Sequence, residues 1–219
     1  MVYLQLQPHA GFGLVGTRPV FLDIRRDRYL ALDGAALGAF EKARAGGPIP
    51  FAAAECLLAT ELFALADAPG QLAAAQAPAP EAGLEFVHRA SGRSILDLPT
   101  VWRLTRRVRH ELKTRPLEQI LRSRRSRQLQ VVAAMRADEA ATLAARFRRA
   151  RCVVPGSPCC LPDSLALRDW LAAHGLASTL IFGVKLEPFA AHSWVQCGKT
   201  ALNEAPDKAA EFTPVFVVP

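Results

Sequence analysis

The sequence predicts an α+β protein with two units, a small sheet-and-helix unit followed by a larger helix-then-strand unit. Three observations support this prediction. Short runs of strand-like residues fill residues 2–32, an Ala-, Pro- and Gln-rich stretch follows at residues 67–82, and long helical patterns from residue 98 precede a group of strands. A chain of 219 residues is long enough for one large domain or two small ones.

The first unit is expected to contain a three-stranded antiparallel sheet plus helices. Residues 2–7 alternate apolar and polar side chains, and the apolar runs at 20–24 and 28–32 have the spacing of a hairpin. Asp33 is expected to cap a helix over residues 34–45, which Gly46, Gly47 and Pro48 end. One or two further helices are expected over residues 51–66.

A linker is expected over residues 69–94, between a domain at 1–68 and a domain at 95–219. Pro69, Gly70, Pro78 and Pro80 interrupt an Ala- and Gln-rich stretch. Such a composition packs poorly and is typical of a tether between domains.

The middle of the chain is helical and strongly basic. Helices are expected from Pro99 in a first turn to residue 113, from residue 117, and over residues 137–149. From Arg103 to Arg151 there are 15 Arg or Lys residues against 4 Asp or Glu residues, within a chain of net charge +7. This excess of positive charge fits either a solvated basic face or a docking surface for an acidic partner. Nucleic acid is disfavoured because Trp102 and Phe147 are the only aromatic residues available for stacking on bases there.

The last third is expected to hold a loop over residues 153–158 and a helix over residues 161–174, which Cys160 precedes and Gly175 ends. Strands are expected at residues 178–184, 192–197, 200–203 and 212–218. A cysteine that opens a helix has its thiolate favoured by the positive end of the helix dipole. Cys160 is therefore a candidate nucleophile, and the alternative is a buried, inert cysteine.

His192 is the candidate base because the other histidines, His9, His88, His110 and His174, lie in loop-like segments or on less suitable helix positions. A third group is needed to hold the imidazole, and Glu204, Asn203 and Asp207 all follow on the next strand or its exit.

The five cysteines have no zinc-like spacing, and we expect no metal site. The N-terminus lacks the pattern of a signal peptide, and the apolar stretch at residues 51–66 is too short to span a bilayer. We therefore expect a cytoplasmic protein with reduced thiols and no membrane partner.

The C-terminal motifs, taken in order, resemble the leader peptidases of lasso-peptide biosynthesis, which are the transglutaminase-like B proteins. The resemblance covers roughly residues 95–219. The matching residues are Cys160-Leu161, Ser164-Leu165-Ala166-Leu167, Gly175-Leu176, Leu180, Phe182-Gly183-Val184, His192, Trp194-Val195 and Asn203-Glu204. The family uses a Cys-His-Asp triad. This chain departs from the pattern at the third position, where Glu204 stands, and Asn203 and Asp207 remain alternatives. Cys160 is preferred over Cys159 because the family cysteine directly precedes Leu.

The resemblance implies a transglutaminase-like or papain-like cysteine protease domain, with helices packed on a small antiparallel sheet, that removes the leader of a ribosomally made precursor. It also implies a winged-helix-like leader-recognition domain at the N-terminus, on which the leader adds as a strand. The residues expected to bind the leader are Arg25, Arg28, Tyr29, Leu30, Ala31, Leu32, Leu58 and Leu62.

The implied partners are the precursor peptide and an asparagine-synthetase-like cyclase, which would be the ATP user, since no cofactor is expected on this chain. Two alternatives stay open. One is a transglutaminase-type acyl transferase that uses the same cysteine, and the other is a non-catalytic nucleic-acid binder that uses the basic helices.

Overall fold

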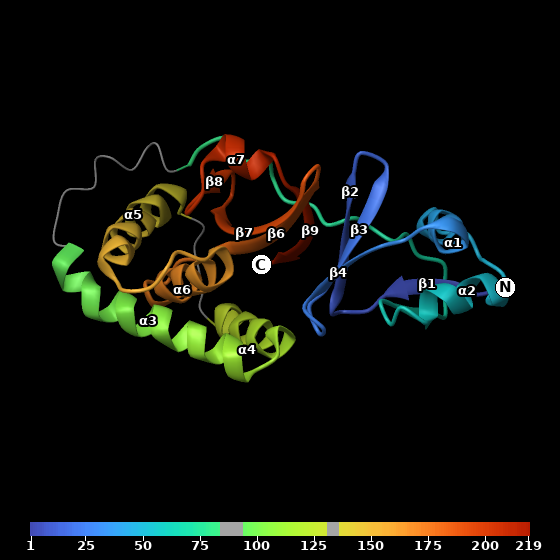
Figure 1. The fold of residues 1–219 in the computed structure, drawn as a ribbon, viewed down its shortest axis with the longest axis horizontal. Coiled ribbons are helices and arrows are strands. Elements are labelled where there is room, and N and C mark those ends of the chain that lie inside the picture. Colours follow the sequence, from blue (N-terminus) through green and yellow to red (C-terminus); the bar gives the residue numbers. More distant parts are fainter. Residues whose placement is uncertain (84–93, 131–135) are drawn as a thin grey trace. The chain divides into compact units, whose positions relative to one another are not determined.

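A computed structural model describes residues 1–83, 94–130 and 136–219. The chain forms two compact units (Figure 1). The first comprises Met1–Gln76 together with Pro214–Phe216, and the second comprises Ala77–Thr213 and Val217–Pro219. The structure is mixed, with a small antiparallel sheet near the N-terminus and helices plus a sheet in the C-terminal region, as the sequence predicts.

The first unit holds two small antiparallel sheets. The strands β2, β3 and β4 form one of them, and β1 pairs with β5 in the other. The bounds are β1 Tyr3–Leu6, β2 Ala10–Val15, β3 Arg18–Asp23, β4 Arg28–Ala31 and β5 Phe63–Ala66. A three-stranded sheet is therefore present, as expected, but it consists of β2, β3 and β4. The first strand is not part of it, and β2, which the sequence analysis missed, pairs along its whole length with β3.

Two helices pack on these strands, α1 (Gly34–Arg44) and α2 (Phe51–Leu58). Asp33 precedes α1 as expected, but its side chain makes no capping hydrogen bond. The core is a cluster of aromatic rings in which Phe40 meets the rings of Phe12 and Phe21 with centroids 5.1 Å apart in each case. Burying several large aromatic side chains together is the main apolar stabilisation available to a unit this small.

The expectation of helix over residues 51–66 is wrong for its second half. Glu61 adopts a φ of 62°, in the left-handed region, which ends the helical path after α2. The chain then forms β5, whose Phe63 pairs with Leu6 of β1. Pairing with the distant strand β1 determines the structure of this apolar segment. The spacing of apolar residues within the segment carries no information about that pairing.

In the second unit, helices precede and cover a four-stranded sheet of order β8-β7-β6-β9. The elements are α3 Ser94–Thr114, α4 Leu117–Gln130, α5 Ala137–Val153, α6 Cys160–Ala173, β6 Thr179–Leu186, β7 Phe189–Cys197, β8 Thr200–Ala201, α7 Pro206–Ala210 and β9 Thr213–Val218. Helix α7 was not predicted from the sequence. Helix α3 begins earlier than predicted, since Pro99, which was expected in its first turn, lies inside it. The bidentate pair of Asp97 with Arg146 of α5, at 2.8 and 2.9 Å, anchors the earlier first turn.

Helix α6 lies at the centre of this unit (Figure 1) and contacts α3 and α5 as well as β6 and β7. Its side chains are buried around nearly the whole circumference, including Leu165, Leu167, Trp170 and Leu171. A helix that is apolar on all sides is stable only when other elements surround it. The first residue of α6, Cys160, is thus held in place by a fully packed helix.

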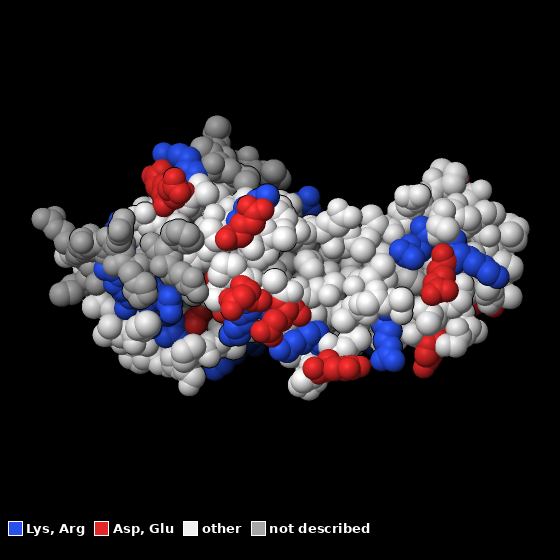
Figure 2. Space-filling model, turned by 90° about the horizontal axis from the view of Figure 1, so that it is seen from above, with Lys and Arg blue, Asp and Glu red and all other residues white. Residues whose placement is uncertain are grey.

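Many of the arginines in the basic helices are neutralised inside the unit. The side chain of Arg124 is 4% exposed, and its Nη2 lies 2.8 Å from Glu111 Oε2 and 2.9 Å from Asp169 Oδ2. Arg107 also pairs with Asp169, at 2.7 Å. On the face shown in Figure 2, most basic side chains likewise lie beside acidic ones. Part of the positive charge counted in the sequence therefore serves helix packing.

The described part of the expected linker is packed. Leu72 is buried in the core of the first unit, and in the second unit Ala82 forms a bridge with Thr200. Residues 84–93 lie outside the described residues. Among the described residues, no helix has the length and apolar character needed to cross a membrane.

Candidate active site

The thiol of Cys160 lies at the N-terminus of α6, where the preceding loop meets the helix. Cys159 is the N-cap residue with an extended backbone, and its own side chain is exposed. The first-turn N–H groups of a helix have no intrahelical acceptor and carry the positive end of the helix dipole. The position therefore favours a thiolate at Cys160 and offers backbone donors to an oxyanion that forms beside it.

The pKa of Cys160 is lowered from 9.0 to about 7, chiefly by its hydrogen bond with His192. Burial opposes this by raising the pKa of the thiol, and hydrogen bonds from the side chain and backbone of Ser193 lower the pKa further. A thiol with a pKa near neutrality is substantially ionised at physiological pH, and the thiolate is the nucleophilic form.

His192 of β7 lies between the thiol and a carboxylate. Its Nε2 is 2.8 Å from Oε2 of Glu204, and both side chains are largely buried, 17% and 12% exposed. Nε2 makes no aligned hydrogen bond in the described structure, so its contact with the carboxylate oxygen is close but not directional. With Nε2 facing Glu204, the ring nitrogen left for the Cys160 thiol is Nδ1.

The other two candidates for the third position are placed differently. The side chain of Asn203 accepts a hydrogen bond from the backbone N–H of Val195 and donates one to Ser164 Oγ, both at 2.8 Å. Ser164 in turn donates to the carbonyl of Ser193. Asn203 thus ties α6 to the strand that carries His192. Asp207 is an exposed residue in the first turn of α7. The geometry brings Glu204 to the imidazole.

Aromatic rings fix the imidazole from the sheet side. The ring of Trp194 is stacked 6.1 Å from that of His192, and the ring of Phe212 is 5.2 Å from it. Gly183 pairs with His192 across the strands, and a Cβ atom at Gly183 would come within 2.8 Å of both Trp194 and Phe212. The missing side chain at Gly183 gives the two aromatic residues room beside the histidine, which explains this glycine in the matching motif.

The loop before Cys160 is held by Arg151 and Asp163. Arg151 donates to the carbonyls of Val154, Gly156 and Ser157. Its Nε is also 2.8 Å from Oδ1 of Asp163, whose Oδ2 accepts from the backbone N–H of Cys159. One buried guanidinium therefore fixes both the loop and the first turn of α6. The sequence analysis missed this pair, and the only signal was an acidic residue three positions after Cys160.

A cavity of about 330 Å³ opens at the thiol. Its walls include Phe147, Leu167 and Leu202, and Cys160, His192 and Glu204 also line it. A mostly apolar cavity with a few convergent polar groups is the usual form of a binding site. The arrangement supplies a nucleophile, a base with its orienting carboxylate, and space for an acyl group.

The residues expected to bind a leader lie in the first unit. Strand β4 pairs with β3 on one side and lies at the end of its sheet, so Arg28, Tyr29, Leu30 and Ala31 belong to an edge strand. Arg25 lies in the preceding turn and Leu32 directly follows the strand. Arg28 contacts Asp23 at 3.4 Å and the carbonyl of Thr60. Leu58 is partly buried at the end of α2.

Leu62 corrects the sequence expectation. It is 0% exposed in the core, because the chain turns into β5 directly after it. A peptide bound on the surface cannot contact Leu62, and the groove expected along residues 56–66 is not one continuous helical face.

The profile of the transglutaminase-like superfamily matches residues 94–217, which include the whole site. The microcin J25-processing protein McjB of Escherichia coli is 40% identical to the chain over 48 residues. That match covers 22% of this chain and 23% of the relative, so the chain spans under a quarter of that protein's length. No solved structure matches the chain.

Proposed function

Because the chain belongs to the transglutaminase-like superfamily, we propose that it is a cysteine leader peptidase of lasso-peptide biosynthesis. The observation that carries the proposal is the contact of Cys160 with His192, and of His192 with Glu204, at one cavity. The similarity to a protein named for microcin J25 processing supports the substrate class, a ribosomally made precursor peptide.

The reaction follows from the positions of the three side chains. The Cys160 thiolate attacks the carbonyl carbon of the peptide bond between leader and core, and His192 gives the thiol proton to the leaving amine. The leader is then a thioester on Cys160, and the core leaves with a free N-terminal amine. Water, deprotonated by His192, attacks the thioester and releases the leader as a carboxylic acid. Glu204 stabilises the imidazolium that forms in each half-reaction.

The first unit is proposed to bind the leader at the open edge of β4. Backbone groups on an edge strand lack ladder partners, and an extended peptide satisfies them by adding as another strand. The exposed Arg25 beside this edge favours an acidic leader residue, whereas the neighbouring Arg26 is paired with Glu61 at 2.6 Å. A binding unit on the same chain raises the effective concentration of the scissile bond at Cys160.

The proposed reaction consumes only water. Lasso-ring closure would follow on a separate partner, an asparagine-synthetase-like cyclase that uses ATP, and the free amine released here is the group that such a cyclase requires.

Mass spectrometry of the full chain incubated with its precursor peptide tests the proposal. The wild-type protein and Cys159→Ala are expected to yield leader and core fragments, and Cys160→Ala is expected to leave the precursor intact. Cleavage by Cys160→Ala at the wild-type rate would contradict it.

A second candidate is acyl transfer of the transglutaminase type, which the superfamily match favours. The same thioester would then be attacked by an amine in place of water. Hydrolysis adds one water to the summed mass of the fragments, whereas transfer joins the leader to the amine. A joined product in the presence of added amines, without free leader acid, would favour the transferase.

A further inference from the structure

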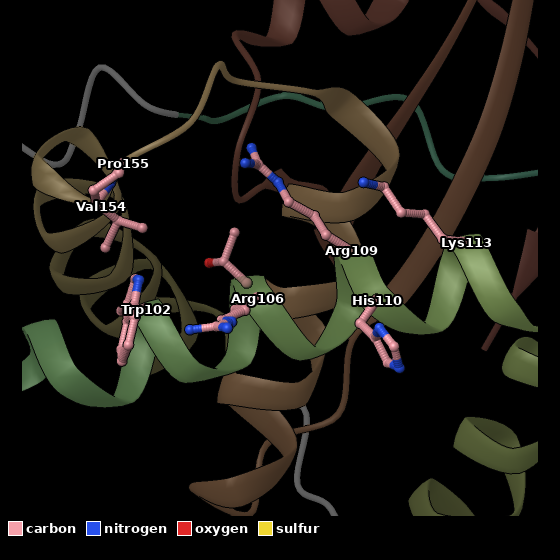
Figure 3. Close-up of a pocket in the computed structure, with 8 residues that line it drawn as sticks. Trp102, Arg106, Arg109, His110, Lys113, Val154 and Pro155 are labelled. Carbon is pink, nitrogen blue, oxygen red and sulfur yellow. The ribbon is translucent and has the colours of Figure 1, made fainter.

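A second cavity of about 260 Å³ is lined by α3 and by the residues that follow α5 (Figure 3). Trp102, Arg106, Arg109 and Lys113 come from successive turns of α3, and Val154 and Pro155 come from the end of α5 and the loop after it. The spacing of these four α3 residues places them along one stripe of a helix. The proposed reaction uses none of them.

The charge of this cavity is uncompensated. Arg106, Arg109 and Lys113 line it, and no Asp or Glu is among its lining residues. Arg107 of α3 and Arg146 of α5 are instead paired with the carboxylates of Asp169 and Asp97. These two arginines serve packing, whereas the three cations of the cavity have no carboxylate partner among the described residues.

The side chain of Trp102 adds an exposed aromatic ring to this charged cavity. Its side chain is 46% exposed, whereas Trp170 and Trp194 are buried. The guanidinium carbon of Arg106 lies 5.5 Å from the centre of the Trp102 ring. Stacking on an aromatic ring holds a guanidinium in one plane while leaving its N–H edge open, and that edge matches a carboxylate.

The cavity is connected to the loop that carries the nucleophile. Val154 and Pro155 line this cavity, and Pro158, Cys159 and Cys160 line the active-site cavity. Only Gly156 and Ser157 lie between Pro155 and Pro158, so the two linings are at most about 11 Å apart along the loop. Arg109 donates to the carbonyl of Ser157, which also accepts from Arg151. A ligand that binds Arg109 therefore contacts one of the two arginines that hold this loop.

We propose that this cavity binds an acidic side chain of the peptide substrate, as a second recognition site beside the scissile bond. The inference rests on the proposed function and extends it to a substrate feature, a Glu or Asp near the cleavage point. The cavity is large enough for one or two side chains, and Trp102 and the imidazole of His110 are the aromatic rings in its lining. Single-stranded nucleic acid binds along continuous basic grooves with several stacking aromatics, which makes a peptide the better match.

Binding is measured on the full chain carrying Cys160→Ala, so that the result does not depend on cleavage. The probe is a short synthetic peptide rich in Glu, and the signal is the fluorescence of Trp102, the one exposed tryptophan of the three. We expect saturable quenching that is lost in Trp102→Phe. Arg106→Glu combined with Lys113→Glu is expected to weaken binding by about tenfold or more, because two attractive contacts become repulsive.

The matched control for each single substitution is Arg103→Glu, which reverses one positive charge at an exposed position of α3 outside the cavity. We expect it to leave the affinity unchanged. An equal loss in Arg103→Glu, or equal binding of a peptide with Gln in place of Glu, would overturn the proposal. Tighter binding of duplex DNA that the cavity variants abolish would also overturn it. If the double variant does not fold, Arg106→Gln and Lys113→Gln measured singly serve the same purpose.

Cleavage gives a second readout. With a precursor that is cut by the wild type, the cavity variants are expected to raise KM and leave kcat unchanged, because the cavity binds substrate away from the reacting atoms. If no precursor is cut, the proposed function fails, and the binding measurement still decides whether the cavity takes an acidic peptide.

Discussion

The carboxylate of Glu204 lies 2.8 Å from Nε2 of His192, which leaves Nδ1 of the imidazole for the thiol of Cys160. The order of groups is that of a thiol–imidazole–acid triad with a glutamate in the third position. Lys208 lies 3.3 Å from the same carboxylate oxygen of Glu204, one helical turn later. Lys208, four residues after Glu204 in the sequence, therefore helps to hold the Glu204 carboxylate beside His192.

Removing the Glu204 carboxylate is expected to slow catalysis without abolishing it. We predict that Glu204→Ala lowers kcat by about 10⁴-fold, as the loss of a triad carboxylate does, and that Glu204→Gln loses less because its amide oxygen keeps a partial negative charge beside the imidazolium. Steady-state cleavage kinetics check this. Asp207→Ala is the control and is expected to have wild-type kcat. A large loss in Asp207→Ala with normal Glu204→Ala would reverse the assignment.

Asn203 is expected to matter for stability. In Asn203→Ala the buried N–H of Val195 loses its acceptor, and Ser164 Oγ loses its donor. We predict a loss of about 2 kcal/mol in the free energy of unfolding, measured by urea denaturation. Asn203→Asp keeps the acceptor for Val195 and is expected to lose less. If Asn203→Ala were fully stable but inactive, a direct role on the imidazole would be indicated instead.

The edge of β4 is expected to bind the leader through its backbone. Successive residues of an edge strand alternate between N–H groups that bond the neighbouring strand and N–H groups that face outward. Of the variants Tyr29→Pro and Leu30→Pro, the one that removes an outward N–H should fold normally and lose leader binding. Fluorescence anisotropy of a labelled leader peptide measures binding, and thermal unfolding identifies the folded variant. Normal binding by that folded variant would contradict strand addition.

The parts of the site that the sequence indicates are those with strong local chemistry. Cys160 at the start of a helix and His192 on a later strand can be recognised from the sequence. The local pattern around each residue is enough to place it on its helix or strand. The third residue stayed open between Asn203, Glu204 and Asp207, because adjacent residues point to different partners and only the fold decides which one reaches the imidazole.

The same holds for the fold, since elements with a strong local sequence signal were predicted and elements without one were missed. The helices and strands around Cys160 follow from periodicity and from Gly175, whereas β2, β5 and α7 were missed. Gly11 and Gly13 weaken the strand signal of β2, and β5 depends on pairing with β1, a partner nearly sixty residues away. The pairing of Arg151 with Asp163 was also beyond prediction, because the chain has many arginines and no local pattern distinguishes the buried ones from the exposed ones.

The ionisation of Cys160 tests the central claim most directly, because it needs no substrate. The rate of Cys160 alkylation by iodoacetamide, followed by peptide mass mapping across pH, reports the thiolate fraction. Because the pKa of Cys160 is lowered to about 7, the wild-type rate is expected to rise with pH through a midpoint near 7 and to fall away below it. His192→Ala should move that midpoint up toward the ordinary 9.0. A wild-type midpoint already near 9, unchanged in His192→Ala, would contradict a histidine-activated thiol at Cys160.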